Sequence, residues 1–113
     1  MLNANSASLA TVAYAQVVGS TGLSPNLNSG VVTARTGAGT YTVTLPQGEG
    51  QAHDLIFVQI MGSVPLFYAA DVDDTDPSIK HVNVGSSSTT AVDADFSFVI
   101  MRSLLTPPPG APA

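Results

Sequence analysis

Three groups of side chains could do chemistry, and the acidic run at residues 71–76 is the first. Asp71, Asp73 and Asp76 bring carboxylate oxygens close together, as at the start of a calcium-binding loop. The rest of that motif is missing, because Asp76 stands where the sharp-turn glycine belongs and Val82 where the bidentate glutamate belongs. We therefore expect a solvated turn without a metal, and these three carboxylates are the candidate ligands if one is bound.

The second group is the pair Asp93 and Asp95, which are two residues apart and would share one strand face. Paired carboxylates perform acid–base catalysis when their environments separate their pKa values. No companion nucleophile accompanies this pair, so we favour a charged strand end that discourages edge-to-edge pairing. A salt bridge to Arg35 or Arg102, within the chain or across an interface, is the other interpretation.

The third group consists of the two histidines, His53 and His81. Hydrolysis by a Ser–His pair requires a carboxylate that orients the histidine, and the adjacency of His53 and Asp54 does not establish one. The Gly-x-Ser-x-Gly and phosphate-loop motifs are absent. We expect no enzymatic activity and no cofactor. A small hydrolase is a third-ranked hypothesis, and a His pair on a threefold axis could hold a metal or an anion.

Charged residues are scarce in this chain. They make up 10% of its 113 residues, against about 25% in typical soluble domains. The net charge is −5 and only three residues are Lys or Arg, which argues against nucleic acid or a membrane as a partner. There is no cysteine, so no disulfide forms. Such a surface is easier to understand if part of it is buried against neighbouring subunits.

Short segments of alternating polar and apolar residues, separated by turn residues, extend over most of the chain. This pattern predicts an all-β protein, an antiparallel sandwich or jelly roll of seven to eight short strands. The first segment is rich in alanine and could instead be helical. The predicted strands are residues 9–18, 31–36, 40–45, 55–61, 66–72, 79–84 and 91–104.

Two stretches of sequence carry a resemblance to a known class of proteins. They are Gly30-Val-Val-Thr-Ala-Arg-Thr-Gly-Ala-Gly-Thr-Tyr-Thr-Val-Thr-Leu45 and Ala94-Asp-Phe-Ser-Phe-Val-Ile-Met-Arg102. Both resemble lines in small virion proteins of tailed phages, namely head-decorating or head-fibre proteins and fibre-tip knobs with a jelly roll of the tumour-necrosis-factor type. The resemblance covers roughly residues 30–103 and implies a homotrimer whose two matching strands pack near a threefold axis.

Two of the predicted strands indicate where the core and the subunit contact should lie. Residues 55–61 and 96–102 are apolar on both faces, so one face should meet the core and the other a neighbouring subunit. The expected core residues are Tyr41, Val43, Phe57, Phe96, Phe98 and Ile100. The expected subunit-contact residues are Val58, Ile60, Val99 and Met101.

We expect three segments: an uncharged arm with the first strand (1–29), the jelly-roll domain (30–105), and an extended Pro-rich tail (106–113). The favoured function is a trimeric decoration or cement protein on the capsid surface of a virion, bridging copies of the major capsid protein or other virion subunits. The alternative is a receptor- or glycan-binding knob of a phage fibre, which would use loops 19–29, 73–78 and 85–90.

Overall fold

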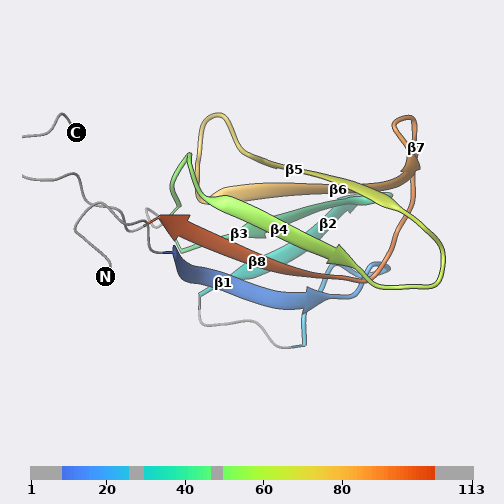
Figure 1. Ribbon diagram of the computed structural model, residues 1–113, viewed down its shortest axis with the longest axis horizontal. Coiled ribbons are helices and arrows are strands. Elements are labelled where there is room, and N and C mark those ends of the chain that lie inside the picture. The colour runs from blue at the N-terminus through green and yellow to red at the C-terminus, as the bar shows by residue number, and fades with distance from the viewer. Residues whose placement is uncertain (1–8, 26–29, 47–49, 104–113) are drawn as a thin grey trace, which may run out of the picture.

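The computed structural model describes residues 9–25, 30–46 and 50–103, and these residues form eight strands and no helix. The strands are β1 (Leu9–Val17), β2 (Val32–Gly37), β3 (Thr40–Thr44), β4 (Leu55–Ile60), β5 (Phe67–Val72), β6 (Ile79–Ser87), β7 (Thr90–Ala91) and β8 (Phe96–Ser103). They make two antiparallel sheets, in the orders β1-β8-β4 and β2-β3-β6-β5, with β7 paired to β6 (Figure 1). The predicted all-β sandwich is confirmed.

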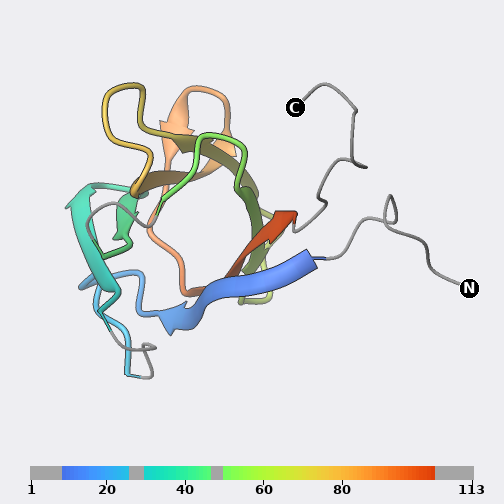
Figure 2. The same cartoon turned by 90° about the vertical axis from the view of Figure 1, so that its left-hand side faces the viewer.

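The two sheets face each other across the core, as the view along the strands shows (Figure 2). The chain changes sheet after β1, β3, β4 and β7, so early and late strands lie side by side in both layers. One consequence is that residues far apart in sequence meet at the ends of the sandwich. The segment before β4 meets the start of β6 and the end of β8 at one end.

The core is built from the inward faces of the central strands. Phe96, Phe98 and Ile100 alternate along β8 and are at most 2% exposed. Their partners on β1 are small, since Ala15 pairs with Phe98 and Ala13 with Ile100, which leaves room for the larger side chains. From the opposite sheet Tyr41, Val43, Leu45, Val82 and Val84 complete the core. Of the six predicted core residues, five are confirmed.

The prediction for the sixth residue, Phe57, is wrong, because its side chain lies outside the core. The outer residues Leu55, Phe57 and Gln59 of β4 are exposed, and Phe57 is 50% exposed. Val58 and Ile60, predicted at the subunit contact, instead pack against the chain's own core. Both faces of this strand are apolar, so alternation could not say which one turns inward. Nor is β4 central, because it lies at the edge of its sheet and pairs only with β8.

The end of the chain is divided differently from the prediction. The expected strand 91–104 is two strands in different sheets, because β7 pairs with β6 and the chain then crosses over before β8 begins at Phe96. Asp93 and Asp95 therefore lie in a connection and not on a strand face. The expected loop 85–90 is largely the β6–β7 hairpin.

The alanine-rich first segment forms β1, a strand, and pairs with β8 along its length, so it is part of the sandwich. The predicted Pro-rich tail 106–113 and residues 1–8 of the arm lie outside the described residues, as do residues 26–29 of one candidate loop.

Candidate functional site

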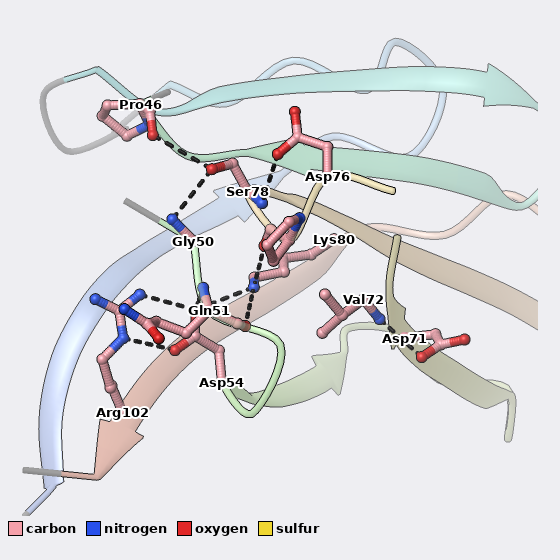
Figure 3. Close-up of polar contacts among 11 residues, drawn as sticks. Pro46, Gly50, Gln51, Asp54, Asp71, Val72, Asp76, Ser78, Lys80 and Arg102 are labelled. Atoms are coloured by element: carbon pink, nitrogen blue, oxygen red, sulfur yellow. Dashed lines mark hydrogen bonds and ion pairs between the residues drawn. The ribbon is translucent and has the colours of Figure 1, made fainter. Parts of the chain in front are cut away.

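A buried cluster of charges joins the two sheets at one end of the sandwich (Figure 3). The side chains of Lys80 and Asp54 are fully buried, with Lys80 Nζ 3.0 Å from Asp54 Oδ2. Arg102 approaches the same carboxylate from β8, its Nε donating to Oδ1 at 2.7 Å and a terminal nitrogen to Oδ2 at 2.9 Å. Asp54 thus connects β6 of one sheet to β8 of the other.

The donors and acceptors in this cluster satisfy one another. Lys80 Nζ donates to the carbonyls of Gln51 and Pro77 and to the carboxylate of Asp54. These three hydrogen bonds use all three protons of the ammonium group. Burial raises the pKa of the Asp54 carboxyl, but hydrogen bonds from Arg102, the Gln51 amide and Lys80 outweigh it and lower the pKa to about 2. The Lys80 ammonium and both carboxylate oxygens of Asp54 are therefore engaged within the chain, and the cluster holds the two sheets together.

A second cluster is centred on Asp93 in the connection before β8. Arg35 pairs with it at 2.9 Å, which confirms the intrachain form of the predicted salt bridge. Oδ1 of Asp93 also accepts the Gly39 amide at 2.7 Å and lies 3.1 Å from the Tyr41 hydroxyl. These hydrogen bonds, that from Arg35 first, hold the pKa of Asp93 below its ordinary value. Asp95 is separate and accepts the Gly19 amide at 2.8 Å.

The acidic turn has the structure of a capped turn. Asp73 Oδ2 accepts hydrogen bonds from the Thr75 amide and hydroxyl and from the Asp76 amide, while Oδ1 lies 3.0 Å from His81 Nε2. Hydrogen bonding, from His81 first, lowers the pKa of Asp73. Asp76 accepts the Ser78 amide and Asp71 accepts the amide of Val72. Within the described ranges no three His, Cys, Asp or Glu side chains gather closely enough to hold a metal ion.

The structure does not bring the histidines together with a nucleophile. His81 meets Asp73 on the surface of β6, and His53 is exposed beside the buried Asp54. In the part of the chain that the structure describes, the hydrogen-bond partner of His81 is the carboxylate of Asp73 and not a serine.

The outer surface of the sheet β1-β8-β4 carries a group of apolar side chains beside a polar row formed by Gln16, Ser97 and Gln59. The register places Tyr14, Val99 and Phe57 in one row across the three strands. Leu55 and Met101 belong to the next row. Tyr14, Phe57 and Leu55 are 53%, 50% and 44% exposed. We call these five residues the outer apolar face.

A groove lies between the start of β5 and the β6–β7 hairpin. These segments are at the end of the sandwich opposite the start of β4, beside which the charge cluster lies (Figure 1). Its volume is about 580 Å³, and its lining consists of residues 67–69 and 83–91. Two aromatic side chains, Phe67 and Tyr68, are 67% and 44% exposed there. We call this feature the hairpin groove.

Comparison with protein-family models, with curated proteins and with solved structures found no match to this chain. Among the described residues there is no helix long and apolar enough to cross a membrane.

Sequence reasoning missed the buried lysine and the groove. Lys80 alternates in step with Val82 and Val84, and that periodicity could have identified it as an inward-facing charge in need of a partner. The groove had no such signal, because its two walls come from segments about fifteen residues apart whose pairing depends on the sheet.

Proposed function

We propose that this chain is a structural subunit that associates with copies of itself through the outer apolar face. The observation on which the proposal depends is that this face extends across all three strands of its sheet and carries no charge. Its aromatic side chains and Leu55 are exposed, and its other two residues are half-buried. Contiguous apolar surface of this kind on a domain marks an interaction site.

The distribution of charge supports association. The three cations of the chain are each committed to a carboxylate of the same chain, Arg35 to Asp93 and both Lys80 and Arg102 to Asp54. None of them is placed to keep the outer apolar face hydrated. Burying that face would remove apolar area from water at about 25 cal/mol per Å², less the cost of association.

The proposed interface keeps part of the predicted set and replaces the rest. Val99 and Met101 lie on the outer apolar face, as expected for the subunit contact. Val58 and Ile60 point toward the core, and Leu55 and Phe57 replace them on β4. Tyr14 on β1 extends the interface across the third strand.

We further propose that the assembly is a homotrimer on the capsid surface of a tailed phage, where it decorates and cements the shell. The support is the resemblance of residues 30–45 and 94–102 to small virion proteins, together with the scarcity of charge. Cementing would follow from cross-linking, since one trimer that contacts several capsid subunits raises the free energy needed to separate them.

The place of the protein on its particle tests this function. Antibodies raised against the purified chain should label the capsid of the virus that encodes it in immunogold electron microscopy. Label confined to the tail tip would favour the fibre-knob alternative, and particles without label would reject a virion role. Particles that lack the protein should also lose their genome at a lower temperature than complete particles.

A further inference from the structure

The hairpin groove has the features of a ligand site that is separate from the outer apolar face. None of its lining residues belongs to that face, and its walls come from the other sheet. At about 580 Å³ it falls within the range of small-ligand pockets. It is also open at the surface, since Phe67, Tyr68 and Asn83 are all exposed.

The shape of the groove depends on Gly85, which pairs with Phe67 on one side and with Ala91 on the other. A Cβ at this position would overlap the carbonyl oxygen of Thr90. The glycine thus allows β7 to lie closely against β6, in the same cross-strand row as Phe67 of β5.

The chemistry of the lining selects a neutral ligand. No Asp, Glu, Lys, Arg or His lines the groove. An anionic ligand would also find no free cation nearby, because Arg35, Lys80 and Arg102 are all paired with carboxylates elsewhere. A cationic ligand would find no carboxylate in the lining.

The lining is amphipathic as well as neutral. Phe67 offers aromatic surface on the sheet face that also carries Asn83, since Tyr68 pairs with the buried Val84 and faces the other way. Asn83 and the hydroxyls of residues 86–90 offer hydrogen-bond donors and acceptors along the hairpin. A sugar ring matches this combination, because its C–H face packs on an aromatic ring and its hydroxyls bond to amide and hydroxyl groups. A purely apolar ligand would leave those polar groups without partners.

We propose that the hairpin groove binds a neutral saccharide, with Phe67 as the packing surface and Asn83 and the hairpin hydroxyls as its hydrogen-bonding partners. This site does not depend on self-association, so it stands or fails independently of the proposed structural role.

The test uses the full chain on a printed array of neutral, sialylated and sulfated glycans, followed by calorimetric titration with the best neutral glycan. We expect saturable binding to neutral glycans. Phe67→Ala should weaken it by about tenfold or more, the loss of one good packing contact. Leu23→Ala, at a similarly exposed apolar residue that does not line the groove, should bind like the wild type.

A second variant is needed because Phe67→Ala could weaken binding by disturbing strand β5. Ser88→Glu places a carboxylate at the exposed hairpin tip, away from β5 and the core, and should reduce binding of the neutral glycan by a similar factor. Thermal unfolding should give midpoints close to that of the wild type for every variant used. The proposal is overturned if no glycan binds saturably, if only acidic glycans bind, or if Phe67→Ala and Ser88→Glu both bind like the wild type.

Discussion

Thr33 is the one buried side chain in the described residues whose polar atom has no hydrogen-bond partner. It is 5% exposed, points inward from β2 and pairs with Val43. A buried hydroxyl without a partner costs about 1–3 kcal/mol, and valine has nearly the same shape without that group. Thr33→Val should therefore raise the free energy of unfolding by about 1 kcal/mol in urea denaturation.

Thr42→Val is the matched control for this substitution, because Thr42 lies on the half-exposed side of β3. Its effect should stay within about 0.5 kcal/mol. A Thr33→Val protein that is no more stable than the wild type would contradict the view that this hydroxyl is a liability.

The Asp54 carboxylate should make the fold sensitive to acid. Its pKa falls from 3.8 to about 2 in the folded chain, so the folded state binds its proton less readily than the unfolded state. The stabilisation is present above pH 4 and is lost as the pH falls from about 4 to 2. Urea unfolding at several pH values should show this decline.

Asp54→Asn removes this carboxylate and so tests its contribution to stability directly. It should cost about 3–5 kcal/mol at pH 7, because it leaves the buried Lys80 ammonium without a counter-charge. The decline between pH 4 and 2 should also become shallower, since one titrating group is gone. An unchanged slope in this range would mean that other carboxylates, such as Asp73 and Asp93, account for the acid sensitivity.

At the scale of the elements, the β2–β3 hairpin depends on Gly39. This residue has a φ of 65°, in the left-handed region, and its amide donates to Asp93. A Cβ there would overlap the carbonyl oxygen of Val84. Gly39→Ala should reduce the free energy of unfolding by about 2 kcal/mol or more, through backbone strain and the overlap.

Gly37→Ala, in the same turn, is the control. Gly37 does not have a positive φ, and an added Cβ would meet only the Thr40 hydroxyl, so it should cost less than about 1 kcal/mol. If both substitutions reduced the free energy of unfolding equally, the positive φ and the close contact at Gly39 would not be the reason that this position requires glycine.

The elements also show what alternation can and cannot predict. Strands β3 and β8 each have one clearly apolar face, and their core residues Tyr41 and Phe98 followed directly from the period of two. In β4 both faces are apolar, so only its register with β8, where Phe57 meets Val99, decides that Phe57 points outward. The groove arises from the pairing of β5, β6 and β7, and the Lys80 cluster from a meeting of the two sheets, so neither set of contacts follows from alternation within one strand.

At the scale of the whole molecule, the sandwich presents two distinct surfaces. The outer apolar face covers one sheet, whereas the hairpin groove belongs to the other. The cations are withdrawn into salt bridges, which leaves a net charge of −5 with no free basic patch. Such a molecule is suited to apolar and neutral contacts, and poorly suited to nucleic acid.

Symmetry distinguishes the ways in which the outer apolar face could be buried. A face packed on its own copy around a twofold axis gives a closed dimer, whereas in a threefold ring it meets a different surface of the next subunit. Phe57→Asp places a charge in the row of the face that spans all three strands and should prevent either assembly without unfolding the chain, because Phe57 is half exposed. Leu23→Asp adds the same charge to an exposed loop outside this face and should leave association unchanged.

The most direct measurement is the native mass of the purified chain by light scattering at two concentrations, for the wild type and for these two variants. The account predicts three times the mass of one chain for the wild type and for Leu23→Asp, and a single chain for Phe57→Asp. A wild type with twice the mass of one chain would contradict the trimer but keep the interface. A wild-type monomer at both concentrations would contradict the proposed self-association altogether.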